Sequence, residues 1–248
     1  MARKKNLTDA DLEDLTTWED QAQRIEVRNT VNLQNISIKV KCLNEKQKQL
    51  KKAIEEKEIV ISIGPAGTGK TYLSLLMALH LLKTEPQYRK IVLIKSVTTI
   101  PGEELGFLPG TLQEKMEPYM WSYLGNLNKI LGDRYTSKKL LESGILSVEP
   151  IAYVRGNTMD NSIVIIDETQ NIDIHTFKTI ITRIGRHSKM IFLGDVEQID
   201  RKGNGSCLAK VHKGFMETDF VGTVEFVNED CVRNTIIPKV LNILNNLT

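Results

Sequence analysis

Apolar residues along the chain gather into short, nearly uninterrupted runs separated by polar stretches. These runs, at residues 58–63, 90–96, 145–150, 162–168, 189–195 and 222–228, are predicted to be β-strands. Strands that are apolar on both sides of the pleat are typical of a parallel sheet covered on both faces. The runs at 162–168 and 189–195 end in acidic residues, which a parallel sheet would place at one edge.

Segments with helical spacing alternate with these strands. At 43–58 the side chains of Leu43, Gln47, Leu50 and Ile54 share one face of a charged amphipathic helix. Helices are also predicted at 70–83, 174–185 and 234–247, and around 111–131 and 136–142 within an insertion at 98–145. The alternation predicts an α/β fold, a three-layer sandwich with a mainly parallel central sheet.

The first 40 residues differ from the rest of the chain. They are polar, contain no glycine and show only weak helical spacing. We therefore predict an N-terminal arm over residues 1–40, either mobile or dependent on a partner, followed by a single domain over residues 41–248.

A glycine-rich stretch, GPAGTGKT, lies between the strand at 58–63 and the helix at 70–83. It fits the pattern G-x-x-x-x-G-K-[ST], in which glycines let backbone N–H groups approach an anion at the start of a helix. A glycine turn before an ordinary surface lysine is the alternative, and the flanking strand and helix argue against it. The predicted nucleotide contacts are Gly64, Pro65, Ala66, Gly67, Thr68, Gly69, Lys70, Thr71 and Tyr72.

Such a phosphate loop requires an acid that can hold a cation beside it. The strand at 162–168 ends in Asp167 and Glu168, next to the loop if the strands are parallel. We expect Thr71 and Asp167 to bind Mg²⁺, Lys70 to reach the β/γ-phosphates and Glu168 to polarise the attacking water. An exposed acidic pair at a strand end is the alternative interpretation.

A third candidate follows the strand at 189–195. The amide of Gln198 could contact the γ-phosphate and the water, although a simple surface turn would explain the same residues.

Composition limits the remaining choices. The formal net charge of +2 offers no electrostatic argument for nucleic acid or membrane binding by itself. No apolar run approaches the roughly 20 residues of a membrane span, and the N-terminus lacks the apolar core of a signal peptide. The three cysteines are widely spaced without a C-x-x-C pair, which favours reduced thiols. We expect a cytoplasmic protein that does not enter a membrane.

Taken together, the motifs resemble the phosphate-starvation-inducible PhoH-like ATPases, which are related to the RecA-like core of superfamily 1 helicases. The resemblance covers about residues 43–237. It is carried by the segments LNEKQ, GPAGTGKT, GEELGFLPG, AYVRGNTMDNSIVIIDETQN, TRIG.HSKM and GDVEQID. A phosphate loop alone is common, whereas this set of segments is specific to the family. Members of this length are frequent in bacteriophages, so a phage protein, active in the host cytoplasm, is expected.

The resemblance implies further roles. Gln47 falls where such proteins read adenine, and an amide can pair with adenine N6 and N7; a helix-face glutamine without a ligand is the alternative. Gln170 and Gln198 fall where helicases couple phosphate release to motion. Arg155, Arg183 and Arg233 match recurring family arginines. We choose Arg233 as the arginine finger, with surface ion pairing as the alternative for each.

The chain also departs from its relatives. Many carry Arg-Pro-Ala after the second strand, where this chain has IKSVTTIPGEELG, so its nucleic-acid contacts there are in doubt. Some relatives add a PIN-type nuclease domain. The stretch before the core is only about 40 residues here, below the usual size of a domain, so no such nuclease is expected.

The resemblance implies a partner, RNA or single-stranded DNA. Candidate contacts are Lys95, Lys115, Lys138, Lys139, Arg155 and Lys202, with Tyr119, Trp121 and Tyr123 as stacking aromatics. Solvated lysines and core aromatics are the common alternatives. One RecA-like core lacks the second wall of the nucleotide site that two-core helicases have, so we expect a homo-oligomer, a hexameric ring by resemblance.

The sequence therefore predicts Mg²⁺-dependent ATP hydrolysis by a RecA-like motor acting on RNA or single-stranded DNA. An ATP-gated binding switch without unwinding, and an ATPase associated with ribonuclease activity, remain alternatives. A small-molecule kinase fits less well, since Glu168 and Gln198 suit water activation.

Overall fold

The computed structural model of the chain describes residues 33, 36–96, 112–132, 137–154, 156–198, 206–233, 236, 240 and 243. Their central feature is a sheet in the order β3-β2-β4-β5-β1-β6, in which every pairing is parallel. The strands are β1 (Ile59–Ile63), β2 (Lys90–Lys95), β3 (Leu146–Pro150), β4 (Ser162–Asp167), β5 (Lys189–Gly194) and β6 (Val221–Glu225).

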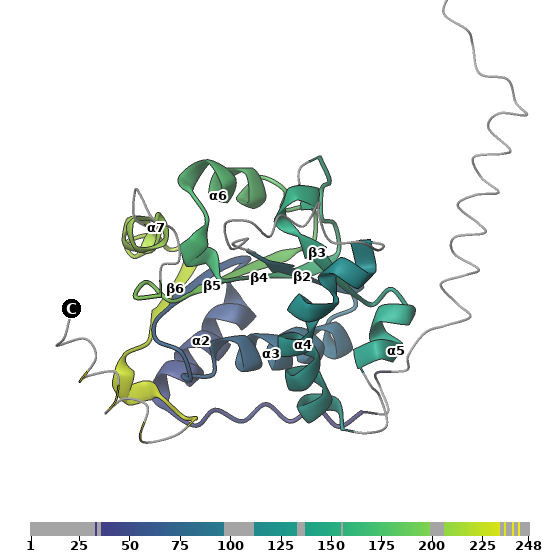
Figure 1. Cartoon of the computed structure of the whole chain (residues 1–248), viewed down its shortest axis with the longest axis horizontal. Helices are drawn as coiled ribbons and strands as arrows, with labels where there is room; N and C mark the ends of the chain where they lie inside the picture. The colour runs from purple at the N-terminus through teal and green to yellow at the C-terminus, as the bar shows by residue number, and fades with distance from the viewer. Residues whose placement is uncertain are drawn as a thin grey trace, which may run out of the picture.

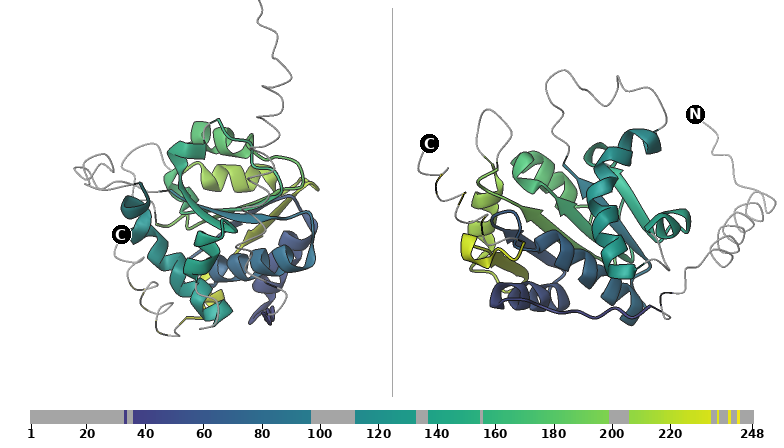
Figure 2. Two further views of the ribbon diagram at one scale, coloured as in Figure 1. Left: turned by 90° about the vertical axis from the view of Figure 1, so that its right-hand side faces the viewer. Right: turned by 60° about the horizontal axis from the view of Figure 1, so that its bottom comes forward.

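Helices cover both faces of this sheet (Figure 1). One face carries α2 (Glu45–Glu56), α3 (Lys70–Thr84), α4 (Leu112–Leu131) and α5 (Ser137–Glu142). The other face carries α6 (Ile174–Ile181) and α7 (Leu208–Phe215), as the turned views of Figure 2 also show. The predicted α/β three-layer sandwich with a parallel central sheet is thus confirmed.

The strands bury both of their sides, which explains their continuous apolar sequences. Side chains alternate between two separate cores, because successive residues of a strand point to opposite faces. In β4, Ile163 and Ile165 pack toward α2, α3 and α4, whereas Val164 and Ile166 pack toward α6 and α7. All four are fully buried.

Helix α3 begins directly after the phosphate loop and is apolar on nearly all sides. It packs between α2 and α4 against the sheet, so its residues from Leu73 to Leu79 are buried. A helix surrounded in this way needs no polar face. Its position anchors the loop that precedes it to the middle of the sheet.

The observed elements agree with the predicted ones to within a few residues, with two differences. Helix α7 was not expected, although Leu208, Val211 and His212 have helical spacing and are buried. The helix expected at 234–247 lies largely outside the described residues, as do residues 97–111 and 133–136 of the insertion. Short 3-10 helices follow β3, β4 and β6: η3 (Ile151–Val154), η4 (Thr169–Asn171) and η5 (Asn228–Asp230).

Contacts with the core begin upstream of residue 41. Leu33 and Ile36 are buried against the α2–α4 face, and the Lys83 ammonium donates a 2.7 Å hydrogen bond to the Ile36 carbonyl oxygen. Residues 1–32 lie outside the described residues, and the arm predicted over residues 1–40 stays a prediction. Within the described ranges, no helix is both long enough and apolar enough to span a bilayer.

Candidate functional site

The phosphate loop connects β1 to α3 at the edge where the parallel strands end. Gly64 has φ 135° and Gly67 has φ 84°, conformations that L side chains rarely adopt. A Cβ atom at Gly64 would also lie 2.4 Å from the Phe226 carbonyl oxygen, so close packing against the residue after β6 requires glycine. The loop therefore has the shape of an anion cradle, with backbone rather than side chains at its surface.

Lys70 lies folded inside this loop. Its ammonium donates hydrogen bonds to the carbonyl oxygens of Gly64 at 2.7 Å and Pro65 at 2.9 Å, and it is 8% exposed. Burial lowers the pKa of Lys70, while the carboxylates of Asp195, Asp167 and Glu168 oppose that shift. A buried ammonium in a backbone cradle is suited to an incoming polyanion, whereas the three nearby acids would repel it unless a cation lay between.

The first residues of α3 meet the end of β4. The Thr71 hydroxyl donates a 3.1 Å hydrogen bond to Asp167 Oδ2, and the Glu168 N–H donates to Asp167 Oδ1 at 3.0 Å. Burial, and secondarily the charge of Glu168, raises the pKa of Asp167, while both hydrogen bonds oppose the shift. A cation beside Asp167 would relieve this unfavourable charge.

These residues fit Mg²⁺, which prefers hard oxygen ligands. A hydroxyl and a carboxylate stand in contact at the mouth of the phosphate cradle. Across the described ranges, no group of three or more His, Cys, Asp or Glu side chains could hold a metal ion. Mg²⁺ commonly takes only one or two carboxylates together with substrate phosphates, which matches a site built from Thr71 and Asp167.

Gln170 connects the predicted base to the neighbouring strand. Its amide Nε2 donates to Glu168 Oε2 at 2.7 Å, and its Oε1 accepts from the Asp195 N–H at 3.1 Å. The side chain is only 2% exposed, and Glu168 itself adopts a left-handed backbone conformation with φ 58°. Both ends of the amide are used, so Gln170 holds the Glu168 carboxylate in one orientation.

Asp195 is a site residue to which the sequence analysis assigned no role. Its Oδ2 accepts a 3.1 Å hydrogen bond from the Ala66 N–H of the phosphate loop, and its Oδ1 accepts from the Glu197 N–H. The carboxylate is nearly buried and borders the loop because β5 lies between β1 and β4. Its position at the end of an apolar strand, like that of Asp167 and Glu168, could have indicated in the sequence that Asp195 belongs to the site.

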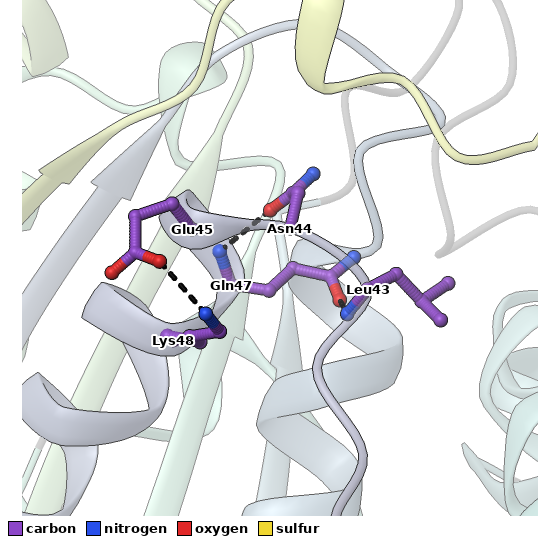
Figure 3. A network of polar contacts seen from close by, with 5 residues as sticks. All are labelled: Leu43, Asn44, Glu45, Gln47 and Lys48. Carbon is purple, nitrogen blue, oxygen red and sulfur yellow. Dashed lines mark hydrogen bonds and ion pairs between the residues drawn. The ribbon is translucent and has the colours of Figure 1, made fainter.

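Gln47 holds the phosphate loop from the side of α2. Its Nε2 donates to the Thr68 carbonyl oxygen at 2.9 Å, and its Oε1 accepts from the Leu43 N–H at 2.8 Å. Figure 3 shows the Leu43 contact together with the Asn44 cap of α2 and the exposed Glu45–Lys48 ion pair. Both ends of this amide are engaged within the protein, so reading adenine would require it to exchange a partner.

A C-terminal strap, which we define as residues 226–233, lies against the phosphate loop. The Val232 N–H donates to the Gly67 carbonyl oxygen at 3.0 Å, and Asn44 Nδ2 donates to the Asp230 carbonyl oxygen at 3.0 Å. A Cβ atom at Gly67 would lie 3.4 Å from the Cβ of Arg233. The exposed Arg233 therefore starts beside the phosphate loop of its own chain.

The other candidates are distributed more widely. Gln198 and Tyr72 are exposed near the loop edge, and Arg183 lies at the opposite edge of the sheet, where its carbonyl accepts from the Met159 N–H before β4. Arg155 lies outside the described residues. The structure thus brings the P-loop, Asp167, Glu168, Gln170 and Gln47 together and leaves Arg183 apart.

The residues predicted to contact nucleic acid differ in their exposure to solvent. Trp121 is 65% exposed, whereas Tyr123, two residues on, is buried. Lys138 and Lys139 are exposed on α5, and Lys95 is half-buried at the end of β2. Outside the described part of the chain lie Lys202 and the side chains of Lys115 and Tyr119.

Comparison with known proteins agrees with this geometry. Residues 39–245 match the PhoH-like protein family. The chain belongs to the PhoH-like family. It is 40% identical over 213 residues to a PhoH-like protein of Bacillus subtilis, covering 86% of this chain and 65% of that protein. It is 36% identical over 201 residues to protein PhoH of Escherichia coli, covering 80% and 56%.

This PhoH-like chain therefore spans less than two thirds of the length of those relatives. Among solved structures it is similar to the large terminase from a thermophilic bacteriophage, at 12% identity and a TM-score of 0.48. That similarity covers 82% of this chain and 50% of the terminase chain. The expectation of a phage origin stays a prediction.

Proposed function

We propose that this PhoH-like protein hydrolyses ATP with Mg²⁺ and couples hydrolysis to binding of RNA or single-stranded DNA. The observation that carries the proposal is the contact between Thr71 of the phosphate loop and Asp167 at the end of β4. It sets a hydroxyl and a carboxylate side by side at the entrance of a glycine-lined anion cradle. That is the arrangement a metal–triphosphate complex requires.

The roles of the individual residues follow from their positions. Phosphate oxygens would replace the carbonyl partners of the Lys70 ammonium, while Thr71 and Asp167 hold Mg²⁺, which neutralises phosphate charge when bound. Glu168, oriented by Gln170, accepts the proton of the attacking water. We propose Gln47 for adenine, Gln198 as the residue that senses the γ-phosphate and Arg233 as the arginine finger.

The experiment compares ATP hydrolysis by the wild type, Lys70→Ala and Glu168→Gln, with the exposed Lys52→Ala of α2 as control. Lys70→Ala should lower turnover by at least about 1000-fold, since it removes the main phosphate-binding cation. Glu168→Gln should bind ATP but hydrolyse it about 100-fold or more slowly, because an amide cannot accept the proton. Hydrolysis retained by Lys70→Ala would contradict the assignment.

The same assay addresses the partner. RNA, single-stranded DNA and duplex are added in turn, and stimulation of the ATPase identifies the nucleic acid. Exposed Trp121 is a candidate stacking platform, so Trp121→Ala should weaken binding by about 1–3 kcal/mol if one base stacks on it. A strand-displacement assay then separates a motor from an ATP-gated switch, which would bind in response to ATP without unwinding.

A further inference from the structure

Tyr123 carries a buried hydroxyl that the fold does not satisfy. The residue lies on α4 and is 1% exposed, yet its hydroxyl has no hydrogen-bond partner in the described part of the chain. Leaving such a group unpaired in the protein interior is unfavourable, because its hydrogen bond to water is lost and not replaced. Phenylalanine would fill the same space without this cost, so packing alone does not account for the oxygen.

The neighbours of Tyr123 lie at the edge of the sheet that carries the site. The Lys95 ammonium stands 6.0 Å from the centroid of the tyrosine ring. Lys95 ends β2 and is in register with Asp167 at the end of β4. The ring is therefore positioned beside the strand ends that present the acidic pair, although α4 belongs to the 98–145 insertion.

Electrostatics support this placement. Burial is the largest cause that raises the pKa of Tyr123 well above its usual value, and the negative charges of Asp167 and Glu168 raise it further. A tyrosine hydroxyl carries its proton at neutral pH in any case and can donate it to a hydrogen bond. The hydroxyl and the Asp167 carboxylate are within reach of one another, and this contact also raises the pKa of Tyr123, but the two groups are not aligned as a full hydrogen bond. The Asp167 oxygens each accept one hydrogen bond already and retain further lone pairs.

We propose that Tyr123 is a positioning residue of the nucleotide site, whose hydroxyl donates a hydrogen bond to a water in the coordination shell of the cation on Asp167. The proposal rests on the proposed function, since it requires Mg²⁺ at Asp167. Filling the site then satisfies the orphan hydroxyl. It also ties α4, with exposed Trp121 on its surface, to the catalytic acids.

The test substitutes Tyr123→Phe, which removes only the oxygen. The control is Tyr88→Phe, which removes a half-buried hydroxyl just before β2, at the opposite end of that strand from Lys95. Binding of Mn²⁺, the probe for Mg²⁺, is measured by electron paramagnetic resonance at saturating ADP. We expect Tyr123→Phe to weaken Mn²⁺ binding about 3- to 10-fold, the range of one hydrogen bond, and Tyr88→Phe to leave it unchanged.

A purely structural role for the hydroxyl makes a different prediction. It would lower the melting temperature of Tyr123→Phe and leave cation affinity alone, whereas we expect a melting temperature equal to or above that of the wild type. Equal Mn²⁺ affinity in Tyr123→Phe and wild type would overturn this inference and leave the proposed function standing. A wild type that binds neither Mn²⁺ nor ADP would overturn the proposed function, and this inference with it.

Discussion

Gln170 shows how a single residue organises the edge of the sheet beside the phosphate loop. Its amide joins the Glu168 carboxylate, after β4, to the Asp195 backbone, after β5. The Asp195 carboxylate in turn accepts from the Ala66 N–H of the phosphate loop. One continuous hydrogen-bonded chain therefore runs from the predicted base to the phosphate cradle, and a change at the cradle can reach the base through it.

Gln170→Glu tests this chain, because it keeps the shape of the side chain but removes the donor to Glu168. Two carboxylates would then face each other, and Glu168 would lose its orientation. We expect ATP turnover to fall about 10- to 100-fold while ATP affinity stays near that of the wild type. Steady-state kinetics would measure this, with exposed Gln49→Glu on α2 as control. Unchanged turnover would show that Gln170 is only structural.

At the scale of elements, α2 contacts both the phosphate loop and the C-terminal strap. Asn44 caps the helix, its Oδ1 accepting from the Gln47 N–H at 2.8 Å, while its Nδ2 donates to Asp230 in the C-terminal strap. Gln47, one turn further along α2, donates a hydrogen bond to the Thr68 carbonyl oxygen. The start of α2 therefore supports the phosphate loop and the strap together.

Substitutions of Asn44 can separate its cap of α2 from its hydrogen bond to the C-terminal strap. Asn44→Ala removes both and should destabilise the protein by about 1–2 kcal/mol, as expected for a lost helix cap. Asn44→Asp keeps the cap acceptor and loses only the donor to Asp230, so it should retain most of the stability. Urea unfolding midpoints provide the comparison, and equal losses in both variants would mean that the strap contact dominates.

At the scale of the whole molecule, the position of Arg233 raises the question of which subunit it serves. Its backbone lies beside the phosphate loop of its own chain, whereas a ring would present the side chain to a neighbour. Arg233→Ala and Lys70→Ala are each expected to be inactive. Mixed in one homo-oligomer, they should recover part of the ATPase, since some interfaces combine an intact loop with an intact arginine.

The dependence of the recovered ATPase activity on protein concentration shows whether the subunits must assemble to be active. Activity that appears on mixing and falls on dilution, together with the mass measured by light scattering, would support an oligomer with an arginine finger in trans. An active monomer, or mixtures no more active than their separate components, would place Arg233 with its own site or outside catalysis.

The global stability should also depend on one buried lysine far from the site. Lys189 starts β5, is 3% exposed and donates to the Lys57 carbonyl oxygen. Burial lowers the pKa of Lys189 to about 8. The native state thus loses this proton near pH 8 and the unfolded chain near its ordinary value, so stability from this group rises with pH between the two.

Lys189→Met should remove that dependence. Relative to the variant, the wild type should gain on the order of 1–2 kcal/mol in unfolding free energy between pH 7 and pH 10. Urea unfolding at several pH values measures the difference, and exposed Lys178→Met on α6 serves as control. Parallel curves for wild type and Lys189→Met would contradict the lowered pKa.

The sequence by itself determined the layered fold, the phosphate loop and the acidic pair. Each depends on neighbours in the chain: a strand buried on both faces reads as an apolar run, and the loop needs glycines at fixed spacing before a helix. The sequence did not predict helix α7, because its eight residues, Leu208–Phe215, have a short and partly polar pattern.

Only the tertiary structure decided which distant side chains meet. Asn44 and Asp230 are 186 positions apart, and the strand order that inserts β5 between β1 and β4 brings Asp195 to the loop. The spacing of apolar residues along the chain indicates which side chains are buried, but it does not show which residues they contact. From the sequence, Gln47 is only an amide on one face of a helix, and its hydrogen bond to the Thr68 carbonyl is seen only in the structure. Tyr123 reads as a core aromatic until its hydroxyl is found unpaired beside the acids.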